Sequence, residues 1–258
     1  YDSLALLSDA GHNLSDVISL VLALLAFRMA KVKPNSRYTY GYKKSTVLVS
    51  LLNAIILLVA VGIILAESIE KLRNPQPIAG GVIAWVAGVG ILINAFTAFL
   101  FLKDKERDLN IKGAYLHLMA DALVSVGVVI SGVIISYTHW YIIDPIIGIA
   151  IAIVILVSTW NLLRDSLRLS LDGVPAGISA EKIRKLLLQV DGVREIHHLH
   201  IWALSTTQNA LTAHVVVASL EDGEAVKNRI KEILSEEHIP HATLELETVA
   251  ECCTDRTD

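Results

Sequence analysis

Five long apolar stretches constrain this chain more than any other feature of its sequence. About 20 consecutive apolar residues cross the hydrocarbon part of a bilayer as a helix, and five stretches reach that length: 4–29, 47–65, 82–102, 114–136 and 143–163. The chain is 53% hydrophobic and its mean hydropathy is +0.56, more than a soluble domain of this size needs for its core. We therefore predict an α-helical membrane domain over residues 1–170.

The loops between these stretches predict how the helices are oriented. Residues 30–46 are rich in Lys and Arg, whereas residues 137–142 have neither, and basic loops remain on the cytoplasmic side. Strict alternation then places residues 103–112, and everything after residue 163, in the cytoplasm as well. The same alternation leaves Tyr1 on the outer side, so we expect one further span before it, six in all.

The composition changes to that of a soluble domain after Asp172. We predict a cytoplasmic domain over residues 174–250 and a tail over 251–258. The hydrophobic periods favour the order helix, strand, strand, helix, strand, over residues 178–190, 193–204, 210–220, 221–237 and 241–249. This order predicts a ferredoxin-like α+β fold, an open sheet with two helices on one face.

Two pairs of ionisable residues interrupt the apolar stretches. His12 and Asp16 are four residues apart, as are His117 and Asp121, so each pair projects from one face of a helix. A carboxylate within a membrane is costly and is by default a functional residue. Two imidazoles and two carboxylates suit tetrahedral Zn²⁺, so we predict a zinc site shared by the two helices.

The types of ligand also predict that the metal ion is exchanged for protons. Imidazole and carboxylate must lose protons to bind a metal and can take them up when it leaves, which favours metal/proton antiport by alternating access. A membrane-anchored metal sensor or scaffold is the alternative. An enzyme is not expected, because the chain has neither H-E-x-x-H nor G-x-S-x-G. Asn53, within an apolar stretch, is expected to hydrogen-bond across helices.

The net charge and the cysteines bear on which partners and which covalent cross-links the chain is expected to have. The formal net charge of −4 gives no indication of nucleic acid as a partner. Cys252 and Cys253 are adjacent and close to the end of the sequence, where they build no disulfide framework. Whether they bind metal stays open, as does the choice among Zn²⁺, Cd²⁺, Co²⁺ and Ni²⁺.

Several segments resemble the cation diffusion facilitator family, in that family's order. They are SLALLSDAGHNLSD, RYTYGYKK, HLMADALVSVGVV, DPIIGIAIA and HHLHIWAL. The resemblance implies divalent-metal efflux, with His12 and Asp16 on the second span and His117 and Asp121 on the fifth. It also implies a homodimer and, since the loop 103–112 lacks a His-rich insertion, a prokaryotic-type protein of the plasma (inner) membrane.

The resemblance further implies a metal site in the cytoplasmic domain. Matched residue by residue, the ligands are His197, His214, His241 and Glu247, with Zn²⁺ as the ion. Strand alternation predicts that His198 and His200 share one face of the sheet while His197 lies on the other.

Overall fold

The computed structural model describes residues 18–74 and 80–248. They form two units, one made of 18–29 with 45–166 and the other of 30–44 with 167–248. The first is helical and the second is α+β, as the sequence predicts.

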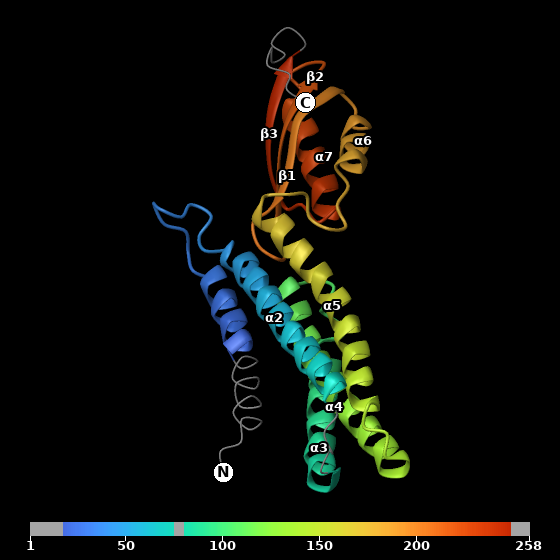
Figure 1. The fold of residues 1–258 in the computed structure, drawn as a ribbon. Helices are drawn as coiled ribbons and strands as arrows, with labels where there is room; N and C mark the ends of the chain where they lie inside the picture. Colours follow the sequence, from blue (N-terminus) through green and yellow to red (C-terminus); the bar gives the residue numbers. More distant parts are fainter. Residues whose placement is uncertain (1–17, 75–79, 249–258) are drawn as a thin grey trace. The chain divides into compact units, whose positions relative to one another are not determined.

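Apolar helices make up the first unit. A helix at Ile18–Ala30 precedes α2 (Ser45–Arg73), α3 (Gly80–Phe101), α4 (Leu109–Thr138) and α5 (Ile143–Ser170) (Figure 1). Among the described residues, α2, α4 and α5 are long and apolar enough to span a membrane, and they contain the predicted stretches 47–65, 114–136 and 143–163. The predicted stretch 82–102 falls on α3, and 4–29 is described only from residue 18.

Small residues allow α2, α4 and α5 to pack closely. A methyl group added at Gly127 of α4 would lie 2.5 Å from the Cδ1 atom of Ile151 on α5, and one added at Gly148 of α5 would lie 2.6 Å from the Oγ atom of Ser68 on α2. Close approach at small residues is how helices associate where lipid replaces water. The contact between the three helices is filled by four buried residues, Val61, Ala120, Ala152 and Ile155.

Hydrogen bonds between buried polar groups join the same helices. The hydroxyl oxygens of Ser50 on α2 and Ser166 on α5 are 2.7 Å apart, and Asn110 of α4 donates its side-chain N–H to the carbonyl of Thr46, 3.0 Å away. Such pairing is required where no water satisfies polar groups. These hydrogen bonds therefore fix the rotation of the helices about their axes near the start of α2 and α4 and the end of α5.

Asp144 joins the opposite ends of the three helices. Its carboxylate accepts a hydrogen bond from the Ser131 hydroxyl at 2.7 Å and lies 3.5 Å from Lys71 Nζ. It stands in the first turn of α5, where a negative charge is favourable. The residue thus links α2 and α4 to the start of α5.

The α+β unit has the predicted element order. It consists of α6 (Ala180–Leu188), β1 (Val193–Ala203), β2 (Asn209–Val217), α7 (Gly223–Glu236) and β3 (His241–Thr248). The sheet order is β1-β2-β3, with β1 and β2 antiparallel and β2 and β3 parallel across the α7 connection. Ser179 caps α6 by accepting a hydrogen bond from the backbone N–H of Lys182.

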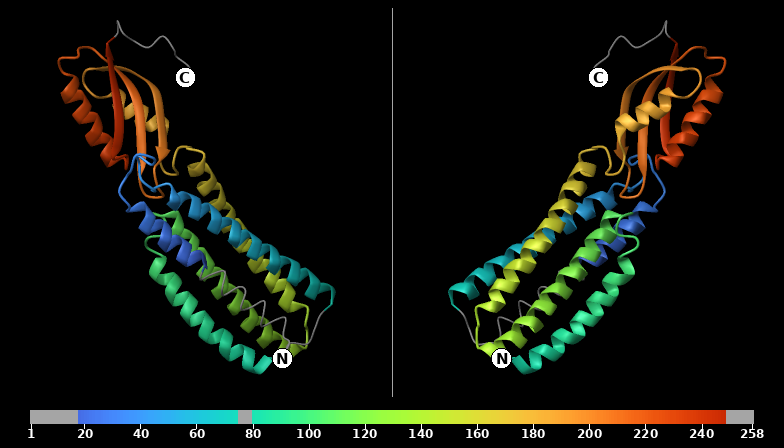
Figure 2. Two further views of the ribbon diagram at one scale, coloured as in Figure 1. Left: turned by 90° about the vertical axis from the view of Figure 1, so that its left-hand side faces the viewer. Right: turned by 90° about the vertical axis from the view of Figure 1, so that its right-hand side faces the viewer.

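Both helices of this unit cover one face of the sheet (Figures 1 and 2). The core lies between them and that face, built from Ile183, Leu187, Val226, Ile230, Leu234, Leu211, Ala213, Val215 and Val217. Alternate residues of the strands therefore point away from the helices. That second face carries the histidines described below.

Candidate metal sites

α4 positions the first group of candidate ligands. His117 and Asp121 are one helical turn apart, and His117 is only 5% exposed. Both line a cavity of about 20 Å³, a volume on the order of one water molecule or one bare cation. The remaining lining residues are Ser19, Leu20, Asn53, Ala114 and Leu118.

His12 and Asp16, the other half of the predicted membrane site, lie outside the described residues. The helix Ile18–Ala30 begins two residues after Asp16 in the sequence. Through Ser19 and Leu20 it contributes to the same cavity as His117 and Asp121.

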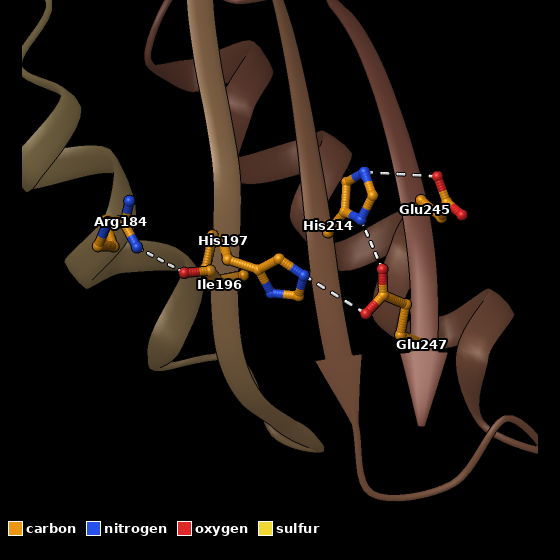
Figure 3. Close-up of polar contacts among 6 residues, drawn as sticks. All are labelled: Arg184, Ile196, His197, His214, Glu245 and Glu247. Atoms are coloured by element: carbon orange, nitrogen blue, oxygen red, sulfur yellow. Dashed lines mark hydrogen bonds and ion pairs between the residues drawn. The ribbon is translucent and has the colours of Figure 1, made fainter. Parts of the chain in front are cut away.

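The second group of candidate ligands comes from all three strands of the sheet. His197 of β1 lies opposite His214 of β2, and Glu247 of β3 follows on the same face, with a ligand atom of each residue within 4.8 Å of the others. His214 Nδ1 is 2.5 Å from Glu247 Oε1, and His197 Nε2 is 3.4 Å from Glu247 Oε2 (Figure 3). Two imidazoles and a carboxylate are a common zinc donor set.

The burial of this group fits a cation. His197 is 5% exposed and Glu247 is 7% exposed, and Nδ1 of His197 has no hydrogen-bond partner among the described residues, while Nε2 makes only the 3.4 Å approach to Glu247. An unsatisfied buried polar group costs about 1–3 kcal/mol. A metal ion bound to His197 would remove that cost while neutralising the buried carboxylate.

A β-bulge corrects the predicted faces of β1. The register moves from His197 opposite His214 to His200 opposite Thr212, so β1 has one extra residue there, and His198 adopts a left-handed φ of 47°. His197 and His198 therefore follow each other on the face away from the helices, with ring centroids 5.3 Å apart. The prediction that His197 lies on the face opposite to His198 and His200 is wrong.

The backbone at the bulge has an additional partner. Arg184 of α6 donates from Nη1 to the carbonyl oxygen of Ile196 at 2.5 Å (Figure 3). The apolar spacing could have revealed the bulge from sequence, because the core positions Ile196, Leu199 and Ile201 are three and then two residues apart instead of alternating.

The remaining predicted ligands are not brought to this group. His241 begins β3, where it pairs with Ala210 and its ring lies 5.6 Å from that of Tyr40. Glu247 follows His241 by six positions along the strand, a distance of roughly 20 Å. Cys252 and Cys253 lie outside the described residues.

Comparisons with known proteins agree with both units. Residues 1–169 match the cation efflux transmembrane domain and residues 175–249 the cytoplasmic domain of cation efflux proteins. The cadmium, cobalt and zinc/H⁺-K⁺ antiporter of Bacillus subtilis is 36% identical over 254 residues, 96% of this chain and 82% of that protein. Zinc transporter ZitB of Escherichia coli is 38% identical over 248 residues, 95% of this chain and 79% of that protein.

The cytoplasmic part of the chain is also similar to a solved structure. The metal-bound C-terminal domain of the CzcD transporter from Cupriavidus metallidurans has 32% identity and a TM-score of 0.26, covering 27% of this chain and 99% of that one. With both halves of the chain matched by the family's models, and with apolar helices long enough to cross a bilayer, the protein is a multi-pass membrane protein of the cation diffusion facilitator family.

Proposed function

We propose that this protein exports Zn²⁺ from the cytoplasm in exchange for protons, binding the ion through His12, Asp16, His117 and Asp121. The observation that carries the proposal is the cavity on α4. His117 and Asp121 both face it within a bundle of apolar helices. An ionisable pair at such a depth is expensive unless it binds something, and membership of an efflux family makes a divalent cation the natural cargo.

The exchange follows from the chemistry of the ligands. When the site opens to the cytoplasm, an arriving Zn²⁺ displaces protons from imidazole and carboxylate groups. When it opens to the other side, protons take the place of the departing metal. The same groups therefore carry charge in both directions, and a proton gradient drives export without any further chemical step, so no catalytic activity is proposed.

Zinc as the cargo is supported by the mixture of nitrogen and oxygen donors, which suits an ion with no strong geometric preference. Harder ions such as Mg²⁺ and Ca²⁺ favour sites made only of oxygen. Relatives named for zinc, cadmium and cobalt place the cargo among divalent ions of this group.

The cytoplasmic unit has a separate role in this proposal. We assign residues 1–170 to transport, 174–250 to cytoplasmic metal binding and homodimer formation, and 251–258 to a tail. His197, His214 and Glu247 would hold Zn²⁺ there, whereas His241 belongs to the proposed set only through family resemblance. If the protein is prokaryotic, the bilayer is the plasma (inner) membrane.

The transport proposal is tested in vesicles that contain the purified full-length protein and a zinc-sensitive dye. With an imposed pH gradient, wild-type protein should move Zn²⁺, and His117→Ala should reduce the rate at least a hundredfold. His139→Asn is the control, because His139 is exposed and has a left-handed φ of 52°, which Asn tolerates.

Equal flux by wild-type and His117→Ala protein would contradict the proposed site. Flux that is insensitive to the pH gradient would contradict proton exchange. Zinc binding to the cytoplasmic unit without any flux would instead favour a membrane-anchored sensor.

A further inference from the structure

Asn53 is a buried amide in the apolar helix α2. Its side chain is 3% exposed, and Nδ2 donates a long hydrogen bond of 3.4 Å to the backbone carbonyl of Ser19, as expected for an amide that joins two helices. Its Oδ1 atom has no hydrogen-bond partner within residues 18–74 and 80–248. The amide nitrogen is therefore hydrogen-bonded within the described residues and the amide oxygen is not.

The orientation of the amide is fixed by chemistry. The backbone carbonyl of Ser19 can only accept, so the nitrogen of Asn53 must face it and the oxygen must point elsewhere. An unpaired carbonyl oxygen in an apolar bundle costs on the order of 1–3 kcal/mol. A helix contact alone explains the nitrogen and leaves the oxygen without a role.

The side chain lies at the proposed transport site. Asn53 lines the same cavity as His117 and Asp121. A Cβ atom added at Gly113, one turn before His117 on α4, would lie 3.9 Å from Asn53 Cβ, so α2 and α4 approach closely at this level.

The positions of Asn53 and His117 along their helices also indicate that the two residues lie at the same depth in the membrane. Asn53 is eight residues after Ser45, the start of α2, and His117 is eight residues after Leu109, the start of α4. At 1.5 Å per residue both lie about 12 Å from the start of their helix. The loops before both helices are predicted to be cytoplasmic, so the two residues are at matching depth.

We propose that the Asn53 side-chain oxygen is an additional ligand of the transported cation and helps to select which divalent ion is carried. This inference rests on the proposed transport site. A neutral carbonyl oxygen is a donor that oxygen-preferring ions such as Mn²⁺ use well, and adding it to two imidazoles and two carboxylates gives a coordination number of five. The side chain then contributes both to affinity for Zn²⁺ and to the ratio of Mn²⁺ to Zn²⁺ transport.

Two substitutions of similar size separate a ligand from a helix contact. Asn53→Leu removes the oxygen, so the KM for Zn²⁺ should rise about tenfold, the lower end of the effect for groups that support a metal site, with the maximal rate within twofold. The ratio of Mn²⁺ to Zn²⁺ transport should fall. Asn53→Asp keeps an oxygen and adds a charge, so the KM should fall and the ratio should rise.

The assay uses the full-length protein in vesicles, with Zn²⁺ and Mn²⁺ as the probes. Asn94→Leu is the matched control, since Asn94 is a half-buried amide on α3 that does not line the cavity; its KM and ion ratio should equal those of wild type. If Asn53→Leu does not reach the membrane, Asn53→Ser, which keeps a polar group but lacks the carbonyl, is judged by the same two quantities.

Opposite shifts of KM and ion ratio in the Leu and Asp variants support the inference. Unchanged KM and ratio in both, or an equal loss of maximal rate in both, overturns it and leaves Asn53 as a helix contact. That result is separable from failure of the transport proposal, in which wild-type flux is missing or His117→Ala transports like wild type, and in that case this inference fails as well.

Discussion

Lys44 donates a hydrogen bond to the carboxylate of Asp172, 128 residues further along the chain. The same ammonium group also donates to the carbonyl oxygen of Leu169 at 2.8 Å and to that of Ala203 at 3.1 Å. All three donors of the lysine are therefore used. A single side chain joins the loop before α2, the end of α5 and the end of β1.

Replacement of Lys44 should loosen this junction. In Lys44→Met the apolar stem is kept but three hydrogen bonds are lost, and charged donors contribute roughly 1.5–3 kcal/mol each when desolvated and less when partly exposed, as here. We expect trypsin to cleave within residues 30–44 of the folded protein several times faster than in wild type. Lys31→Met, at an exposed lysine of the same loop, should leave the cleavage rate at the other sites unchanged, and equal rates in both variants would contradict the role of Lys44.

The core of the α+β unit should support folding of residues 171–258 on their own, because every residue of that core lies between Val174 and Leu246. Leu187→Ala, at a fully buried position of α6, should lower the free energy of unfolding by about 2–5 kcal/mol. Leu188→Ala, at the exposed neighbour, should change it by less than about 0.5 kcal/mol. Urea unfolding followed by circular dichroism measures both, and similar losses in the two variants would contradict the described helix face.

Zinc should stabilise the same segment through His197, His214 and Glu247. At a zinc concentration of 100 Kd the free energy of unfolding should increase by about 2.7 kcal/mol, and addition of a chelator should reverse the gain. The gain should shrink as the pH falls, since imidazole and carboxylate bind metal only when deprotonated. His197→Ala should abolish it and His241→Ala should preserve it; the reverse result would restore His241 as a ligand and remove His197.

The left-handed backbone at His198 makes the bulge sensitive to side-chain shape. His198→Val should destabilise the segment by about 1–2 kcal/mol and weaken zinc binding, because a β-branched residue is strained at a positive φ. His198→Asn, which tolerates this conformation, should change stability by less than about 0.5 kcal/mol. Urea unfolding and zinc titration test the pair, and a valine variant as stable as the asparagine variant would show that the bulge is not fixed by this residue.

The elements of this fold could be predicted from sequence because period and length are local properties. Apolar length alone identified α2, α4 and α5. Simple alternation did not predict the pairing of β1, although the spacing of Ile196, Leu199 and Ile201 indicates the inserted residue. Simple alternation fails wherever one residue is inserted, and the face of His197 depends on pairing with His214 in another strand.

The same distinction between local spacing and tertiary structure applies to the candidate sites. Spacing of four residues on a helix placed His117 and Asp121 on one cavity, since a helix fixes neighbours locally. Family resemblance grouped His241 with Glu247, but the two lie far apart on β3, because the separation along an extended chain grows with every residue. The amide oxygen of Asn53, which is buried and has no hydrogen-bond partner among the described residues, could be found only from the three-dimensional packing.

The bulge in β1 allows the strand to keep its apolar residues in the core while it holds His197 on the other face. If β1 kept His198 but paired with β2 by regular alternation, either the imidazole of His197 or the aliphatic side chains of Leu199 and Ile201 would turn to the opposite side of the sheet. The first arrangement buries an imidazole in the hydrophobic core, and the second exposes two aliphatic side chains to water. A strand of these residues without the bulge therefore keeps either its metal ligand or its core residues on the correct face, and only the bulged strand supports both.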